Sequence, residues 1–185
     1  MKAVREHVAL ASPPGHDPLA PTPITPASPM ARGLLYSQFS LGQRFVSVGR
    51  TVTEADVVNF AGISGDYNPL HTDAVFAAKT PFKQRIAHGM LSAAISTGLG
   101  QTLGIFEGTV LGLVGQTFEY KGAVFFGDTI RLALTVQTLT PSSKGGKGVV
   151  VFASEILKTP AGADYGDGDT VAITGTWTVL FTDKA

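Results

Sequence analysis

Gly89-Met-Leu-Ser-Ala-Ala-Ile-Ser-Thr-Gly-Leu-Gly-Gln-Thr-Leu103 is the stretch around which the fold is predicted to form. It is the best candidate for a long helix, because its apolar residues recur with helical spacing. One face would carry Met90, Ala93, Ala94, Thr97 and Gly98, and another Leu91, Ile95 and Leu99. A helix that is apolar on most sides is typically buried. We therefore expect this helix to lie in the core.

Downstream of the helix, from Thr109 onward, the hydrophobic period changes to two. Segments rich in Val, Ile, Thr, Phe and Leu with this period are predicted strands. They cover residues 111–120, 128–138, 148–158 and 170–182, and an extended segment over 42–51 is predicted to precede them. Strands joined by short loops predict an antiparallel sheet. One buried helix with such a sheet predicts an α+β fold.

Upstream of the helix, Thr53 and Asp56 have the spacing of a capping box, which marks the start of a helix. Val57, Phe60 and Ala61 give this shorter helix one apolar face. We expect it to end between residues 62 and 65, and a further helical turn to form over residues 74–78.

The segment after the shorter helix, Ser64-Gly-Asp-Tyr-Asn-Pro-Leu-His71, gathers polar side chains in a few positions. Pro69 fixes its own φ and restricts the preceding residue, so we expect a bent loop that cannot continue the helix. Asp66 and His71 together offer a carboxylate and an imidazole, the usual parts of a general acid/base pair. An ordinary Asx turn with a surface histidine is the alternative interpretation.

Composition excludes several classes of protein. The chain has 185 residues, of which 44% are apolar, and its formal net charge is zero. A nucleic-acid-binding protein would need a basic surface. The absence of cysteine excludes disulfides and thiolate metal sites, and it fits a cytoplasmic enzyme. The sequence contains no run of 18 apolar residues, so no membrane span is predicted. No metal and no cofactor is expected.

The N-terminal part has a different composition from the rest. Residues 1–35 hold seven of the eleven prolines, with Ser, Thr and Ala between them. Such a segment is predicted to be a disordered, Pro-rich arm. Residues 36–185 are then predicted to form the single folded domain. Met30 is a second candidate for the first residue of the protein.

The 64–71 motif resembles the hydratase-2 motif of the MaoC-like (R)-specific enoyl-CoA hydratases. The segments Ala77-Ala-Lys-Thr-Pro-Phe82 and Ile86-Ala-His-Gly-Met-Leu91 match the same family in the same order. The resemblance covers the chain from Gln43 to the C-terminus. It implies a single hot-dog fold, in which an antiparallel sheet wraps around the long helix. Because relatives pair two hot dogs, it also implies a homodimer or a higher homo-oligomer.

The resemblance further implies a lyase of fatty acid metabolism. Such an enzyme adds water to trans-2-enoyl-CoA to give (R)-3-hydroxyacyl-CoA, or catalyses the reverse dehydration. Asp66 and His71 would share one water, and either could be the base. Asn68 would orient this water or the loop. The Gly89 N–H group, unpaired at the start of a helix, would bind the thioester oxygen, although Gly89 could instead serve only close packing.

Two further residues are candidates for substrate binding. His88 lies beside Gly89, and we expect it to hydrogen-bond the 64–71 loop rather than to ligate a metal. Thr97 lies two helical turns beyond Gly89 on a similar face. It could support the site, or its hydroxyl could bond back to its own helix.

Several alternatives stay open at this point. Lys79, Lys83 and Arg85 could meet the phosphates of coenzyme A or form a solvated face. The acyl carrier could be an acyl carrier protein, or the substrate a branched dicarboxylic acyl-CoA. A hot-dog thioesterase or a non-catalytic acyl-CoA-binding module would share the fold, since fold alone does not define function.

Overall fold

The computed structural model describes residues 33–184, and within them it confirms the predicted α+β fold. The helices are α1 (Glu54–Ser64), α2 (Pro69–Thr72), α3 (Ala74–Ala77) and α4 (Gly89–Thr102), with a 3-10 turn over Tyr36–Gln38. The strands are β1 (Arg44–Val46), β2 (Arg50–Thr51), β3 (Val110–Tyr120), β4 (Thr129–Pro141), β5 (Lys147–Thr159) and β6 (Thr170–Thr182). Most of the arm predicted over residues 1–35 lies outside the described residues. In the part of the arm that is described, the backbone N–H groups of Gly33 and Leu34 donate to the carbonyls of Gly104 and Ile105.

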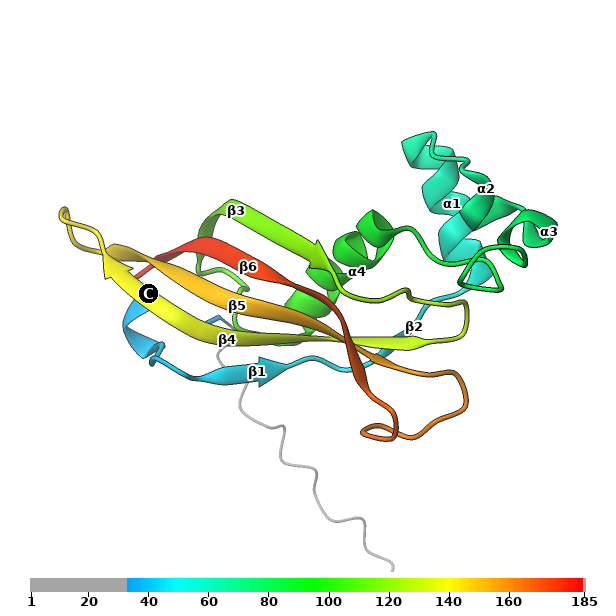
Figure 1. The fold of residues 1–185 in the computed structure, drawn as a ribbon. Helices are drawn as coiled ribbons and strands as arrows, with labels where there is room; N and C mark the ends of the chain where they lie inside the picture. The colour runs from blue at the N-terminus through cyan, green and yellow to red at the C-terminus, as the bar shows by residue number, and fades with distance from the viewer. Residues whose placement is uncertain (1–32, 185) are drawn as a thin grey trace, which may run out of the picture. The chain divides into compact units, whose positions relative to one another are not determined.

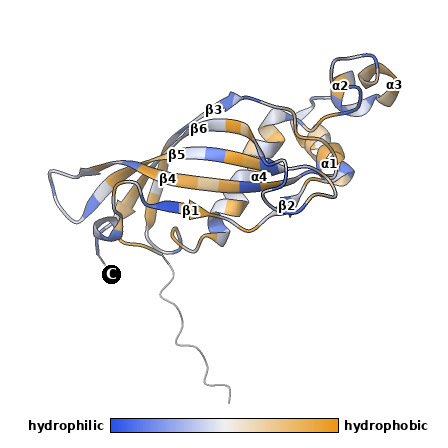
Figure 2. Ribbon diagram, turned by 60° about the horizontal axis from the view of Figure 1, so that its bottom comes forward, coloured by the Kyte–Doolittle hydropathy of each residue, from blue (hydrophilic) through white to orange (hydrophobic). Residues whose placement is uncertain are grey.

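All strand pairs in the sheet are antiparallel, as the sequence predicts. The strand order is β1-β4-β5-β6-β3 (Figure 1). The short strand β2 also pairs with β4, next to β1 along the same edge. The extended segment predicted over residues 42–51 is therefore two short strands rather than one. Figure 2 shows hydrophobic and polar residues mixed along the long strands, and along β5 buried side chains alternate with partly exposed ones, so the sheet has one face for a core.

The central helix α4 packs against this sheet (Figure 1). Leu91, Ile95 and Leu99 are buried there. Beside them lies an aromatic cluster formed by Phe39, Phe106, Phe152, Trp177 and Phe181. Within the part of the chain that the structure describes, no helix is long and apolar enough to cross a membrane.

The burial of α4 differs from the prediction on one side. The residues Met90, Ala94, Thr97, Gly98 and Gln101 form an exposed stripe along the helix. The sheet covers the opposite side of α4 and leaves these five residues exposed. The sequence prediction of a helix buried on most sides is thus wrong for the isolated chain.

The helices α1, α2 and α3 lie together at one end of the sheet (Figure 1). The predicted capping box is present: the Thr53 N–H donates to Asp56 Oδ2 at 2.8 Å, and the Asp56 N–H donates to Thr53 Oγ1 at 3.2 Å. At the other end of α1, Gly65 adopts φ of 75°, a left-handed conformation that suits glycine. This turn ends α1 and directs the chain into the polar segment.

The sequence predicted a bent loop for the polar segment. In the structure only its first part is a loop, and the rest forms the short helix α2. The preceding helix α1 ends at Ser64, as expected, and Pro69 begins the new helix. A proline at the first helical position needs no N–H partner, and its φ already suits a helix. Consequently Asp66 lies on a loop, whereas His71 lies on a helical turn.

Candidate active site

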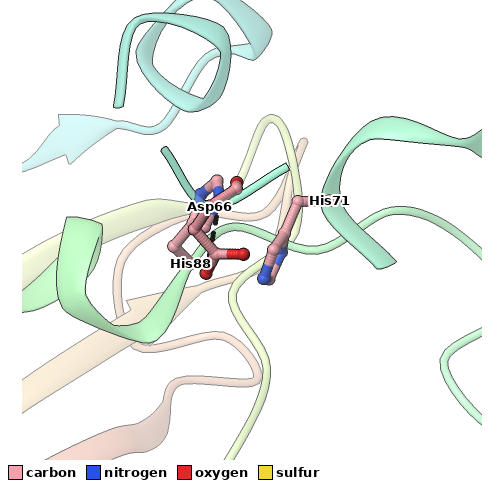
Figure 3. A group of neighbouring side chains, drawn as sticks. All are labelled: Asp66, His71 and His88. Atoms are coloured by element: carbon pink, nitrogen blue, oxygen red, sulfur yellow. Dashed lines mark hydrogen bonds and ion pairs between the residues drawn. The ribbon is translucent and has the colours of Figure 1, made fainter. Parts of the chain in front are cut away.

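A pocket of about 590 Å³ lies where the N-terminus of α4 meets the segment between α1 and α2. One wall comes from the α1–α2 region, and the opposite wall comes from residues 120–124 at the end of β3. Asp66, His71, His88 and Gly89 all line it. Figure 3 shows Asp66, His71 and His88 converging from three separate parts of the backbone. The structure thus brings together most of the residues that the sequence singled out.

Local hydrogen bonds hold Asp66 in place. Its N–H donates to Ser64 Oγ at 3.2 Å, and its Oδ1 accepts from the Asn68 N–H at 3.2 Å. The other carboxylate oxygen, Oδ2, lies 4.0 Å from His88 Nε2. About half of the Asp66 side chain is exposed, with a relative accessibility of 52%. The carboxylate therefore keeps an oxygen that a water in the pocket can reach.

The position of His71 is fixed by a contact distant in sequence. Its Nδ1 lies 2.8 Å from the carbonyl oxygen of Ile86. A carbonyl can only accept a hydrogen bond, so Nδ1 must carry the proton of this bond. In neutral His71 the lone pair is then on Nε2. This assignment leaves Nε2 as the nitrogen that can accept a proton.

His88 is the buried member of this group of side chains. It is 2% exposed, and its Nε2 donates to the backbone carbonyl of Asp66 at 2.9 Å. Its ring lies 3.8 Å from the ring of His71, centroid to centroid, and 5.1 Å from that of Phe60. His88 therefore contacts both the Asp66 loop and the His71 ring, and it also lines the pocket.

Asn68 has a local role in the fold. Its Oδ1 accepts from the Leu70 N–H at 2.9 Å, which caps the N-terminus of α2. Asn68 does not line the pocket. Of the two tasks expected from the sequence, orienting the water or the loop, these contacts support the second.

The spacing of Asp66 and His71 suits a bridging water. Together with His88 they offer ligand atoms that all lie within 4.8 Å of one another. A water that bonds two acceptors at about 2.8 Å each can span up to about 5.6 Å. One water can therefore hydrogen-bond both the Asp66 carboxylate and a ring nitrogen of His71.

The same three residues could also contribute ligands to a metal ion. Zinc bonds to nitrogen and oxygen are 2.0–2.2 Å long, which puts neighbouring tetrahedral ligands about 3.4 Å apart. The Asp66 and His88 side chains, with Oδ2 and Nε2 4.0 Å apart, would have to draw closer than they are in this structure. One nitrogen of each histidine is already bonded to a backbone carbonyl. The observed geometry therefore suits a water better than a cation.

Gly89 lies at the first position of α4, and the preceding residue gives no side-chain cap. Its N–H group is thus one of the donors that have no partner within the helix. A Cβ at this position would lie 2.5 Å from Cε1 of Tyr120, which is too close for two carbon atoms. Close packing on Tyr120 accordingly requires a glycine here, whether or not the N–H group also binds substrate.

Thr97 does not join this group. Its hydroxyl donates to the Ala94 carbonyl at 2.7 Å, within its own helix. Eight residues separate it from Gly89, and a rise of 1.5 Å per residue carries it about 12 Å along the axis. It lines a second, smaller pocket of about 150 Å³ with Gln101, Leu113 and Gln116. The structure therefore does not support the expectation that Thr97 adjoins the Asp66 site.

The basic residues near the site differ in their partners. Arg85 forms an ion pair with Glu54 at 2.5 Å and covers the ring of Phe126. Within residues 33–184, Lys79 and Lys83 form no side-chain hydrogen bond or ion pair, so their charges face solvent. Lys83 adopts φ of 63°, unusual for a residue other than glycine.

Sequence reasoning missed the wall made by Tyr120 and residues 121–124. Tyr120 is half exposed, and its hydroxyl donates to Met90 Sδ at 3.1 Å across the mouth of the pocket. An exposed aromatic residue at the end of a strand gives no local signal of such a contact. Only the packing of β3 beside α4 makes it part of the site.

Comparison with known proteins gives a consistent assignment. The family model described as "MaoC like domain" matches residues 38–155. An (R)-specific enoyl-CoA hydratase of Rhodospirillum rubrum is 43% identical over 99 residues, which cover 53% of this chain and 67% of that protein. A 3-hydroxybutyryl-CoA dehydratase of Methylorubrum extorquens is 32% identical over 142 residues, covering 71% of this chain and 88% of the relative.

A solved structure agrees with these matches. The unliganded R-hydratase of Pseudomonas aeruginosa superposes with a TM-score of 0.67 at 29% identity. The superposition covers 83% of this chain and 89% of that one. The antiparallel sheet packed on α4 is thus the hot-dog fold that the sequence resemblance implied.

Proposed function

The chain belongs to the MaoC-like domain family, and from this we propose that it hydrates trans-2-enoyl-CoA to (R)-3-hydroxyacyl-CoA or catalyses the reverse dehydration. At the coarser level it is a lyase of the hydratase and dehydratase class. Relatives whose names specify an (R)-specific enoyl-CoA hydratase or a 3-hydroxybutyryl-CoA dehydratase support the choice of substrate.

The observation that carries the proposal is the gap of at most 4.8 Å between the Asp66 carboxylate and a ring nitrogen of His71. Hydration of a 2-enoyl thioester requires a hydroxyl group on C3 and a proton on C2. A water held by both side chains can supply both, because it lies beside a base and within reach of the double bond.

In the proposed reaction, His71 carries the proton. The water oxygen bonds to C3 while one water proton moves to His71 Nε2, and the C2=C3 electrons move toward the thioester carbonyl. C2 then takes the proton back from His71, which restores the neutral ring. Asp66 accepts the other hydrogen bond of the water and stabilises the positive charge on His71.

The Gly89 N–H group is proposed to bind the thioester oxygen as negative charge develops on it. It lies at the N-terminus of α4, where backbone N–H groups carry partial positive charge. Removing one donor of this kind typically costs about 2.7–4 kcal/mol of transition-state stabilisation. This contribution complements the acid/base pair.

The test is an assay with enoyl-CoAs of several chain lengths and with one enoyl-acyl carrier protein. Loss of enoyl absorbance and release of free thiol are followed together. We expect absorbance loss without thiol release. Thiol release would instead identify a thioesterase, and no change with any substrate would identify a binding module.

Stereochemistry provides the stricter criterion. Asp66 and His71 lie on one side of the pocket, so water and proton should add to the same face of the double bond. We expect only the (R) product by chiral chromatography. The product is also offered to an (S)-specific 3-hydroxyacyl-CoA dehydrogenase, and rapid oxidation by that enzyme would contradict the proposal.

The protein is also proposed to form a homodimer. β3 is an edge strand, and its side chains Leu111, Leu113 and Val114 are each more than half exposed. The exposed stripe of α4 is uncharged and adjoins the same edge through the second pocket. An unprotected apolar edge of this length invites pairing with another strand, and a second copy would cover it.

Light scattering coupled to size-exclusion chromatography tests the dimer. Leu113→Lys places a charge on the proposed interface and should yield monomer. Val48→Lys is the matched control, because Val48 is also exposed, at 64%, but lies between β1 and β2. A Leu113→Lys protein that stays dimeric would show that β3 is not the interface.

A further inference from the structure

A partly buried ion pair lies beside the backbone of one pocket wall. Lys158 near the end of β5 places its Nζ 3.6 Å from Asp128 Oδ2. The two side chains are only 15% and 5% exposed. Burying charged groups is costly unless each finds partners, so the partners of this pair are informative.

Those partners include backbone groups of the pocket wall and of the residue that follows it. Lys158 Nζ donates to the Ala123 carbonyl at 3.1 Å and lies 5.2 Å from the centre of the Phe125 ring. Asp128 Oδ2 accepts from the Phe125 N–H at 2.8 Å, and Asp128 Oδ1 accepts from the Ala161 N–H at 3.2 Å. The pair therefore fixes the segment 121–125, of which residues 121–124 line the pocket.

The same segment is bonded to the chain that holds His71. The Ala87 N–H donates to the Val124 carbonyl at 2.8 Å, and Ile86 forms a β-bridge with Phe125. The carbonyl of Ile86 is the acceptor for His71 Nδ1. A continuous path of short contacts thus leads from Lys158 to the imidazole.

We propose that Lys158 and Asp128 are positioning residues for His71. By fixing segment 121–125 they hold the Ile86 carbonyl, and this carbonyl keeps the proton of neutral His71 on Nδ1. The lone pair of Nε2 then faces the shared water. This inference rests on the proposed function, in which His71 carries the proton.

The expected effect follows from the geometry of proton transfer. A displacement of about 1 Å in a reacting group can lower a rate by about 10²-fold. Without the Lys158 ammonium, the Ala123 carbonyl loses its donor, and the Ile86 carbonyl loses part of its support. His71 should then sample both tautomers, and kcat should fall more than KM changes.

The test compares Lys158→Met with Arg131→Met as a matched control. Arg131 forms an ion pair with Asp169 of similar burial, at 18% and 21% exposure, and its ring contact is with Tyr165. It has no hydrogen bond or ion pair with residues 86–87 or 121–125. Each variant loses one largely buried cation, so a general loss of stability should be similar in both. A difference between them then reports on the contact with segment 121–125.

Two measurements are made on each full-length variant. Long-range ¹H–¹⁵N spectra report the tautomer of His71, assigned by comparison with His71→Gln. Steady-state kinetics report kcat and KM. We expect a single Nδ1–H tautomer in the wild type and in Arg131→Met, and a tautomer mixture in Lys158→Met with kcat lowered by at least about 10-fold.

An unchanged His71 tautomer in Lys158→Met, or an equal change in Arg131→Met, would overturn the proposal. If Lys158→Met does not fold, Asp128→Asn removes the opposite charge while keeping an amide oxygen as acceptor, and the same two results decide. The spectra do not depend on turnover. A wild type without hydratase activity would therefore refute the proposed function, while the tautomer would still test the positioning.

Discussion

His71 depends on residues far from it in sequence for its place in the site. Its ring contacts His88, its Nδ1 proton bonds the Ile86 carbonyl, and one of its ring nitrogens lies within 4.8 Å of a carboxylate oxygen of Asp66. Asp66 is in turn held through its backbone carbonyl by His88. The proposed acid/base pair is thus part of a small network in which each member is held by another residue.

The first prediction follows from this network. Asp66→Asn and His71→Ala should each lower kcat by at least about 10²-fold, as expected for general acid/base residues. The double variant should be little worse than the poorer single one, because groups that act as a unit are not additive. Thermal unfolding of each variant serves as the folding control. Near-normal turnover in either single variant would remove that residue from the proposed chemistry.

The second prediction separates the two possible roles of Gly89. Gly89→Ala should reduce both stability and activity, because the new Cβ would lie 2.5 Å from the Tyr120 ring. Adding Tyr120→Ala should restore stability, since it removes the clashing ring. If the thioester oxygen approaches the Gly89 N–H directly, the methyl group still obstructs it, and activity should stay low. Full recovery of turnover in the double variant would mean that Gly89 serves packing alone.

At the scale of elements, the capping box of α1 fixes the helix that leads into the Asp66 loop. Burial alone would raise the pKa of the Asp56 carboxyl, but hydrogen bonds from Thr53 and the nearby Arg50 guanidinium outweigh it and lower this pKa. A group whose pKa is lowered on folding stabilises the native state above its ordinary pKa. The ordinary pKa of this carboxyl is 3.8, and the stabilisation is lost as the pH falls below that value and through the lower pKa of the folded protein.

The third prediction is therefore a pH-dependent effect. Asp56→Asn should reduce the free energy of unfolding by about 1 kcal/mol at pH 7, the typical size of a capping contribution. The difference from wild type should shrink as pH falls below 3.8. Urea unfolding at several pH values measures it, and Asp164→Asn, on an exposed loop, is the control for the same charge change. A difference that does not vary with pH would contradict the role given to the carboxylate.

At the scale of the whole molecule, residues 38–155 match the family model, and residues 1–29 precede this match. The fourth prediction is that deleting residues 1–29 leaves fold, assembly and activity intact. Their Pro-rich composition offers little apolar surface to bury. Circular dichroism, light scattering and the enoyl-CoA assay on the truncated and full chains would test this. Aggregation or loss of turnover would show that the segment is needed.

Much of the fold follows from local patterns in the sequence. The alternation of apolar residues after Thr109 predicts the four long strands, and the spacing in 89–103 predicts α4. Thr53 and Asp56 mark the start of α1 because a capping box involves only neighbouring residues. The motif 64–71 likewise points to Asp66 and His71, since the chemistry of a side chain does not depend on the fold.

The tertiary structure decided what no local pattern contains. Only the packing of β3 beside α4 brings Tyr120 over Gly89, and only long-range pairing brings the Ile86 carbonyl to His71. The same packing leaves one stripe of α4 exposed and puts Thr97 in a different pocket. Helical spacing shows which residues share a face, but which face is covered depends on elements distant in sequence. The sequence by itself thus singled out the candidate acid/base groups, and the fold determined their distances, the tautomer of His71 and the surroundings of the pocket.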